Sequence, residues 1–302
     1  MSPLTRRRLV ATAAAAAAAG LLPRDLLARL EAMSDPDHAR LDDWTAALRR
    51  DGLCRASASL GRAAARVGEL AMGTPYVAHT LEAYLDGGSR SEREPLTLSL
   101  TRFDCVTLVE SCLGVARAAG GAGEGAWDRF GREVERMRYR GGVREGYASR
   151  LHYFSEWIAD GERRGLVRDL GAELGGVEDV RPLRFMTEHR GSYAALAHEP
   201  TFREIGAVER RLDGAPRRVV PTARIPEVAG RIETGDVLAF ATAIPGLDVT
   251  HAAFAYRGAD GVLRVLHAPL SGGVVEISRT TLPQYVAAIR RSTGILVARP
   301  LR

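Results

Sequence analysis

The chain has 302 residues, a formal net charge of +5 and a 46% share of hydrophobic residues. That length supports a buried core, and ordinary shares of charged (26%) and aromatic (6%) residues exclude a disordered or fibrous chain. All 42 basic residues are arginines, which excludes a phosphate-loop lysine, a Schiff-base lysine and a Ser-x-x-Lys nucleophile.

Residues 1–22 have the layout of a secretory signal. Arginines 6–8 precede an alanine-rich apolar stretch of about a dozen residues, which is too short to span a bilayer comfortably. Residues 5–10 (TRRRLV) are typical of a twin-arginine export motif, and no lipobox cysteine follows them. We therefore predict an export signal and linker over residues 1–30, and a periplasmic or secreted mature protein that leaves by the twin-arginine route.

Without this signal the chain is much less basic, and export would place it in an oxidising compartment. Three of the five net positive charges belong to arginines 6–8, so we predict no nucleic-acid partner. The rest of the chain has no stretch of 18 or more apolar residues, so we predict no integral membrane segment in the mature chain. The three cysteines are too few for a disulfide framework, although export would allow Cys54 and Cys112 to pair.

From residue 37 onward the chain has no low-complexity linker and no repeat. Apolar residues at helical spacing predict helices over five ranges: 41–49, 58–72, 105–119, 126–139 and 150–164. Later, short runs bounded by Gly, Pro and Asp predict strands over 181–187, 236–243, 251–257, 262–268 and 294–299, with a helix over 282–291. Helices followed by an antiparallel sheet predict an α+β fold, which we assign to one domain over residues 31–302.

The start of the helix over 105–119 carries a candidate nucleophile. Asp104 is a good N-cap residue, which places Cys105 in the first helical turn. The unpaired N–H groups and the helix dipole there favour a thiolate and can also stabilise an oxyanion. The alternative is a small buried core residue, and Cys112, one helical repeat further on, fits that description well.

A cysteine nucleophile needs a base, and two histidines flank one predicted hairpin. If the turn between the strands centres on Ala259, His251 and His267 lie directly opposite each other, with Cβ atoms about 5 Å apart. A register slip of one residue would place them on opposite faces of the sheet. The strand at 236–243 would lie beside the His251 strand and form the floor of a cleft, and Asp248 would serve in a turn or a supporting contact.

Five motifs in order resemble those of the NlpC-type, papain-like cell-wall hydrolases. They are GTPY (73–76), FDC (103–105), GDVLAF (235–240), THAAFAY (250–256) and VLHA (265–268). The resemblance implies an α+β papain-like (NlpC-type) fold, with the nucleophile on a core helix packed against an antiparallel sheet. It implies Cys105 as nucleophile, His251 as base and His267 as the residue that orients the base. Tyr76 and Asp104 would lie beside the nucleophile as substrate-binding residues.

Two departures from the family pattern point to a subgroup. The nucleophile is followed by Val106 and Thr107 instead of Ser-Gly, and a helical insert around 120–185 separates it from the Gly-Asp strand. With the segment at 149–157 (SRLHYFSEW), these features resemble the larger N-acetylmuramoyl-L-alanine amidases. That resemblance implies a cofactor-free and metal-free enzyme acting on peptidoglycan fragments or muropeptides, which cleaves the amide between the N-acetylmuramic acid lactyl group and L-alanine. Arg150, His152 and Tyr153 then become substrate-binding candidates, with a packed helix face as the alternative.

Other functions remain open from the sequence. A zinc amidase could use Cys105, His251 and His267 as ligands, joined by His152, although no local His-Glu-x-x-His or Cys-x-x-Cys pair is present. The same framework serves endopeptidases that cut between D-glutamate and diaminopimelate, and a non-catalytic wall-binding module is a third alternative. The sequence does not distinguish intact wall from soluble fragments as the substrate.

Overall fold

The computed structural model describes residues 35–86, 93–121, 125–270 and 273–302. The predicted export signal therefore lies outside the described residues. Five helices that the sequence predicts are present with small changes at their ends: α3 (Pro36–Arg50), α4 (Leu60–Leu70), α5 (Cys105–Ala118), α6 (Ala126–Arg138) and α7 (Phe154–Arg163). The predicted late helix is α11 (Leu282–Ala288).

The strands form one sheet in which every recorded pairing is antiparallel, so the predicted α+β class with an antiparallel sheet is confirmed. The sheet runs β2-β3-β8-β4-β5-β6-β7, with β1 paired to β8. Four predicted strands are present: β4 (Val237–Thr242), β5 (Val249–Arg257), β6 (Leu263–His267) and β8 (Ser292–Pro300). Four shorter strands were not predicted: β1 (Val167–Asp169), β2 (Val177–Asp179), β3 (Arg217–Pro221) and β7 (Glu276–Ile277).

The strand predicted over 181–187 is wrong. Its second half forms the short helix α8 (Phe185–Glu188), whose amides at Met186 and Thr187 lie 3.2 Å from the Glu209 carboxylate. Glu209 lies on α9 (Glu199–Leu212), a helix that the sequence analysis missed together with α10 (Ile225–Val228). A buried carboxylate from a helix distant in the sequence therefore accepts hydrogen bonds from these N–H groups. The alternation of apolar and polar residues along a short segment cannot reveal such a tertiary contact.

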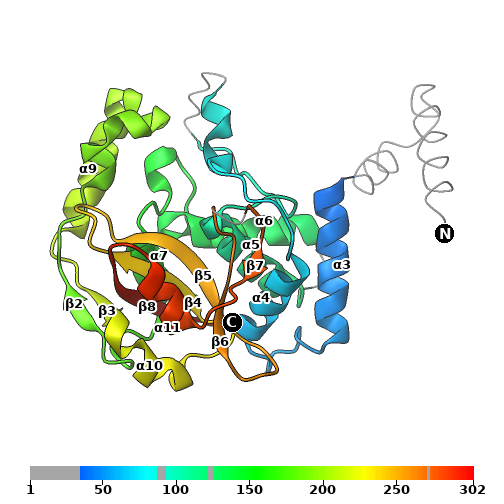
Figure 1. Ribbon diagram of the computed structural model, residues 1–302. Coiled ribbons are helices and arrows are strands. Elements are labelled where there is room, and N and C mark those ends of the chain that lie inside the picture. The colour runs from blue at the N-terminus through cyan, green and yellow to red at the C-terminus, as the bar shows by residue number, and fades with distance from the viewer. Residues whose placement is uncertain (1–34, 87–92, 122–124, 271–272) are drawn as a thin grey trace, which may run out of the picture.

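Helices cover both faces of the sheet. On one face α4 and α5 lie against the sheet, and Leu108, Val109 and Cys112 of α5 share the larger apolar core with Ala252 and Phe254 of β5. On the other face α10 and α11 complete a second core with the alternate side chains of β4, β5 and β6. Figure 1 shows α3, α4, α5 and α6 gathered beside the sheet, with α9 projecting from the far end. The start of α5 therefore meets the sheet beside β5.

Two glycines shape the site, one through a close approach and the other through a turn of the backbone. Gly235 has a φ of +89°, and a Cβ there would lie 1.9 Å from the carbonyl oxygen of Gly61, so the Gly-Asp motif docks directly on α4. Gly73 has a φ of +79° and redirects the chain after α4. Beyond it, the Tyr76 backbone forms a bridge with Phe103, which brings GTPY next to Asp104 and Cys105.

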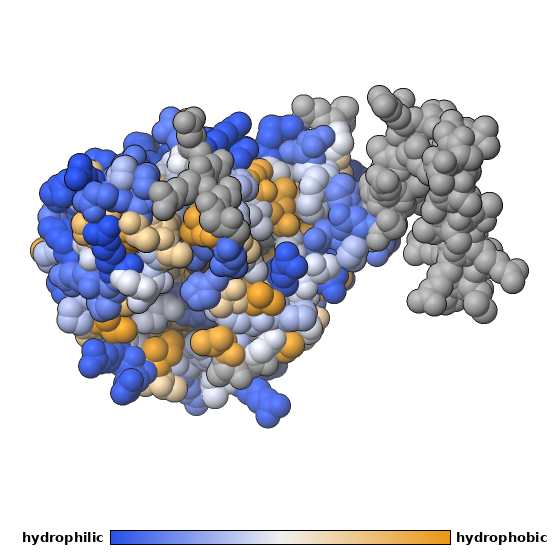
Figure 2. Space-filling view, turned by 90° about the horizontal axis from the view of Figure 1, so that it is seen from above, coloured by the Kyte–Doolittle hydropathy of each residue, from blue (hydrophilic) through white to orange (hydrophobic). Residues whose placement is uncertain are grey.

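Within the described part of the chain, no helix is long and apolar enough to cross a membrane. Figure 2 shows apolar side chains on one face of the molecule as separate patches between hydrophilic residues. Cys54, Cys105 and Cys112 are all free thiols, and Cys112 is fully buried in the core as the sequence predicts.

Candidate active site

The candidate nucleophile lies at the first position of α5. The Asp104 carboxylate accepts from the Thr107 amide at 2.7 Å, and the Thr107 hydroxyl oxygen accepts from the Asp104 amide at 2.8 Å. This reciprocal cap starts the helix at Cys105, so the prediction for the helix start is confirmed. The helix behind it is buried, whereas Cys105 itself remains partly exposed.

The sulfur of Cys105 lies against the edge of β5. The backbone N–H of Ala252, the residue after His251, donates to it, as do the N–H groups of Val106 and Cys105 itself. Tyr76 lies close enough for the charges of Cys105 and Asp104, after burial, to raise the pKa of its phenol. Three backbone donors therefore surround the Cys105 sulfur, and the Tyr76 phenol lies near it.

The two histidines meet, but in a different register from the predicted one. Phe254 pairs with Leu266, so the hairpin turn centres one residue later than predicted and His251 lies diagonal to His267. The predicted direct opposition is therefore wrong. Moving the turn centre by one residue moves each cross-strand partner by two residues. Side chains alternate between the faces of a sheet with a period of two, so both rings stay on one face. His251 Nε2 lies 2.9 Å from His267 Nδ1.

Aromatic side chains hold the histidine pair in place. The Phe240 ring stacks on His251 with centroids 5.6 Å apart, and the Tyr285 ring meets His267 edge-on at 5.0 Å. The Tyr285 hydroxyl lies 3.3 Å from His267 Nδ1. Phe240 falls inside the GDVLAF motif, but no sequence signal singled out Tyr285, which α11 brings from the end of the chain. We call Cys105, His251 and His267 the cysteine–histidine cluster.

Charge is disfavoured throughout the cysteine–histidine cluster. Burial, assisted by the negative charge of Asp104, raises the pKa of Cys105 to about 12 in spite of the three backbone donors. Burial lowers the pKa of His251 to about 3 and that of His267 to about 4. The expectation that the helix start favours a thiolate is therefore wrong for the resting protein, because desolvation outweighs the dipole and the N–H groups. The resting pair is a thiol and a neutral imidazole.

The segment at 149–157 builds a second polar cluster. Arg150 forms ion pairs with Glu82 at 2.9 Å and Glu94 at 3.4 Å, and it stacks over the Tyr147 ring. His152 packs against the same ring, and its Nε2 lies 2.9 Å from the Tyr147 carbonyl oxygen. Burial and the Arg150 charge lower the pKa of His152 well below its usual range. We call these residues (Glu82, Glu94, Tyr147, Arg150 and His152) the arginine cluster.

Tyr153 points elsewhere. Its hydroxyl donates to the Glu209 carboxylate at 2.7 Å and lies 3.2 Å from the Met186 amide, which ties α7 to α8 and α9. The structure therefore joins Arg150 with His152, and it separates both from Tyr153. Substrate binding by these three residues stays a prediction, and the contacts of Tyr153 favour the alternative of a packed helix face.

Asp248 has the supporting role predicted for it. Its carboxylate is buried and accepts from the amides of Ser155, at 2.7 Å, and Val249, at 2.8 Å. These bonds join the start of α7 to the start of β5, two residues before His251. Among the described residues, Asp248 forms no hydrogen bond with either histidine, and the contact of His251 Nε2 is with His267.

The metal alternative finds little support in this geometry. Among the residues that the structure describes, no three His, Cys, Asp or Glu side chains converge in a way that could hold a metal ion. His152, the fourth ligand considered, belongs to the arginine cluster. The donor set that a zinc amidase would need is therefore not assembled in the described residues.

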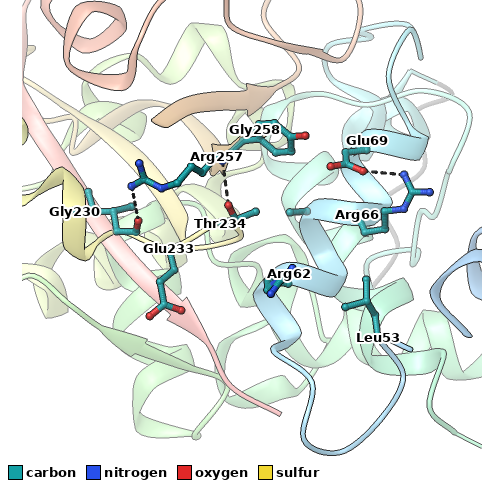
Figure 3. A pocket seen from close by; sticks show the side chains of 12 residues that line it. Leu53, Arg62, Arg66, Glu69, Gly230, Glu233, Thr234, Arg257 and Gly258 are labelled. Carbon is teal, nitrogen blue, oxygen red and sulfur yellow. Dashed lines mark hydrogen bonds and ion pairs between the residues drawn. The ribbon is translucent and has the colours of Figure 1, made fainter. Parts of the chain in front are cut away.

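A separate groove of about 500 Å³ lies at the other end of β5. Figure 3 shows its charged lining, which includes Arg62, Arg66 and Arg257. Arg66 is paired with Asp51 and Glu69, and Arg257 donates to backbone carbonyl oxygens. Most of its positive charge is therefore already engaged, and the groove stands apart from the cysteine–histidine cluster.

Comparison with solved structures places this fold among amidases. Two crystal structures of an N-acetylmuramoyl-L-alanine amidase from Bacteroides uniformis share 31% and 30% sequence identity with this chain, with TM-scores of 0.73 and 0.72. Each alignment covers 80% of this chain and 99% of the amidase. A protein from Legionella pneumophila, 17% identical over 88% of this chain and 97% of its own, has the same fold with a TM-score of 0.61.

The comparison with protein families agrees with the structural one. No curated protein matches this chain. Residues 66–295, which contain all five motifs, match the pattern of the AmiA-like family, described as N-acetylmuramoyl-L-alanine amidase-like. The predicted resemblance to the larger amidases is thereby confirmed at the level of the family. The chain belongs to the AmiA-like family of amidase-like peptidoglycan hydrolases.

Proposed function

We propose that this protein is a cysteine-dependent amidase that cleaves the bond between the N-acetylmuramic acid lactyl group and L-alanine in peptidoglycan fragments. The observation that carries the proposal is the position of Cys105 at the capped start of α5, where its sulfur accepts from the N–H of Ala252, the residue that follows His251 of the His251–His267 pair. The choice of bond follows the solved relative that is itself named N-acetylmuramoyl-L-alanine amidase.

We also assign the fold to the NlpC-type, papain-like class. A buried helix that presents a cysteine at its amino end, packed on an antiparallel sheet whose strands carry the two histidines, supports this assignment. In this view α6, α7 and the short strands β1 and β2 belong to an insert between the nucleophile helix and the Gly-Asp strand, and one catalytic domain spans residues 31–302.

In the first chemical step the thiol proton is transferred while the sulfur–carbon bond forms. Because the resting thiol and imidazole are both neutral, His251 takes the thiol proton as the Cys105 sulfur attacks the carbonyl carbon. The backbone N–H groups of Cys105 and Val106 donate to the resulting oxyanion, and losing one such donor typically costs about 3 kcal/mol.

The intermediate then collapses with the proton moving onward. Protonated His251 gives its proton to the L-alanine nitrogen, the carbon–nitrogen bond breaks, and the peptide leaves with a free amino group. The lactyl carbonyl remains bound to Cys105 as a thioester. His251 next takes a proton from water as the water oxygen bonds to the thioester carbonyl carbon. The carbon–sulfur bond then breaks, the lactyl group leaves as a carboxylic acid, and His251 returns the proton to the Cys105 sulfur.

Substrate would enter beside Tyr76. Its phenol keeps its proton at neutral pH and lies near the Cys105 sulfur, so it can donate a hydrogen bond to the scissile carbonyl or a neighbouring substrate oxygen. Asp104 contributes through the helix cap, and Arg150 and His152 would shape a more distant part of the substrate site. Export by the twin-arginine route would deliver the enzyme to its cell-wall substrate.

The test uses a defined disaccharide-tetrapeptide and mass analysis of the products. We expect free tetrapeptide and a disaccharide without peptide, and we expect neither product from the C105A variant. Cleavage between D-glutamate and diaminopimelate would instead support the endopeptidase alternative. Loss of activity with iodoacetamide, which reacts with thiols, supports the cysteine mechanism, whereas loss with a chelator alone would support a zinc amidase.

A further inference from the structure

One nitrogen of His267 lacks a hydrogen-bond partner although the side chain is only 1% exposed. Its Nδ1 is approached by His251 Nε2 at 2.9 Å and by the Tyr285 hydroxyl at 3.3 Å. Its Nε2 is buried with no partner within hydrogen-bond distance. Leaving a buried donor unpaired costs about 1–3 kcal/mol, so this nitrogen needs an explanation.

The neighbours of Nδ1 decide which nitrogen of His267 carries the proton. Burial raises the pKa of Tyr285 to about 12, so its hydroxyl keeps its proton at neutral pH and can donate it to Nδ1 of His267. His251 must also donate from Nε2, because its other nitrogen has to be free to take the Cys105 proton. With donors on both approaches, Nδ1 of His267 is an acceptor, and the ring proton sits on the orphaned Nε2.

An acidic side chain lies directly in front of that N–H. Glu276 on β7 is the cross-strand partner of His267 on β6, and such partners point to the same face of a sheet. Glu276 Oε1 is 3.9 Å from His267 Nε2, and the Glu276 side chain is 47% exposed. An N–H···O bond needs about 2.9 Å, so a small rotation of this half-exposed side chain completes the contact.

We propose that Glu276 is a positioning residue of the amidase, which accepts the Nε2–H of His267 and thereby fixes the tautomer and charge balance of the histidine pair. This proposal rests on the cysteine mechanism proposed above. A neutral histidine stabilises an imidazolium less than a carboxylate does, and Glu276 supplies the missing negative charge one ring further away. No proton leaves His267; it donates one hydrogen bond and accepts another.

The effect of Glu276 should be moderate and dependent on salt. Solvent and ions screen a half-exposed carboxylate, so its removal should cost about tenfold in kcat, well below the loss of the base itself. Among the described residues, the side chains in contact with the histidine pair from neighbouring elements are Phe240, Tyr285 and Glu276, and Asp104 lies further off beside Cys105. Because the carboxyl group of Glu276 is the acidic group nearest to His267, its loss should move the acid limb of the pH–rate profile to lower pH.

The experiment compares kcat, KM and pH profiles of E276A and E276Q on the defined muropeptide. The matched control is E178A, because Glu178 is also a half-exposed glutamate in a cross-strand pair of this sheet, 52% exposed and opposite Arg218 on β3. We expect about tenfold lower kcat and an unchanged KM for E276A, a smaller loss for E276Q, which keeps an acceptor oxygen, and no change for E178A.

A second comparison separates positioning from a general structural effect. In an H267A background, the E276A change should have no further effect on kcat, because its route to His251 is gone. Nitrogen NMR of the histidine side chains should show His267 protonated on Nε2, with mixed tautomers in E276A. Normal kinetics and an unchanged tautomer in E276A, with C105A inactive, would overturn this inference alone. An active C105A would instead overturn the cysteine mechanism.

Discussion

The cysteine–histidine cluster and the arginine cluster are both polar and at least partly buried, but they differ in how charge is balanced within them. In the first, burial pushes Cys105 and His251 toward their neutral forms, with pKa values raised to about 12 and lowered to about 3. In the second, Arg150 lies between two carboxylates, from Glu82 and Glu94. The cysteine–histidine cluster holds its titratable groups neutral, whereas the arginine cluster pairs opposite charges.

This difference indicates which cluster serves catalysis and which stabilises the fold. A buried group without a counter-charge changes its protonation state when a substrate brings new charge, which is what attack by a thiol requires. A buried ion pair keeps its state, and breaking it leaves an isolated charge in the protein. We therefore expect changes in the cysteine–histidine cluster to affect turnover, and changes in the arginine cluster to affect folding.

The largest effect should come from replacing Cys105 with alanine. Without the sulfur no thioester forms, so kcat on the defined muropeptide should fall by about 10⁴-fold or more. The melting temperature should change little, because Cys105 is partly exposed. The matched control is C112A on the same helix, which removes a fully buried sulfur and should lower the melting temperature while turnover per folded molecule stays normal. The reverse pattern would contradict the assignment of the nucleophile.

The two histidines should differ in importance. H251A removes the group that exchanges protons with thiol, leaving group and water, and should lower kcat by about 10³-fold. H267A leaves the base in place and loses only its orienting hydrogen bond, so about 10- to 100-fold is expected. Steady-state kinetics of the two variants test this order. An equal loss would mean that His267 itself exchanges protons with the substrate.

Local chemistry explains which parts of this site were predictable. The start of α5 follows from Asp104 and Thr107, which cap each other within four residues. The hairpin register was not predictable, because the loop allows more than one turn centre. Asp260 decides between them, since its carboxylate accepts from the Val262 amide at 3.1 Å and pairs with Arg264. The shared face of the histidines survived that error because side chains alternate with a period of two.

Long-range contacts explain what the sequence could not give. Tyr285 and Glu276 reach His267 from α11 and β7, and neither belongs to a motif with a recognisable spacing. The neutral state of Cys105 also depends on burial by distant segments, whereas the capped helix start alone pointed to a thiolate. The partners of Arg150 come from residues more than fifty positions earlier in the chain, so its ion pairs were invisible to local patterns.

Replacing Arg150 with methionine tests the arginine cluster. The change keeps an apolar stem but removes the Arg150 charge that pairs with the fully buried Glu94, which should cost about 3–5 kcal/mol of unfolding free energy in urea titrations. Adding E94Q should recover part of the loss. Normal stability combined with a raised KM would instead show that Arg150 binds substrate.

The dependence of the unfolding free energy on acid pH should show that His267 is neutral in the folded protein. His267 has a lowered pKa of about 4 in the folded protein, so the unfolded chain, with a pKa of about 6.5, binds the proton more tightly. Unfolding free energy is therefore lost as the pH falls from about 6.5 toward 4. The H267N variant cannot take up this proton and should lose about 2–3 kcal/mol less than the wild type over that range, as measured by urea titration at each pH. Equal losses would contradict a neutral, buried His267.

The smallest effect should come from replacing Tyr153 with phenylalanine. The ring stays in its apolar site, and only the hydroxyl that bonds Glu209 and Met186 is lost. Glu209 keeps its contacts with the Met186 and Thr187 amides, so its carboxylate is not left unpaired and about 1 kcal/mol of stability should be lost. Turnover and KM should not change, because this hydroxyl serves the junction of α7, α8 and α9. A raised KM with normal stability would show that the Tyr153 hydroxyl binds substrate. It would also contradict the conclusion that this residue has a structural role and no catalytic one.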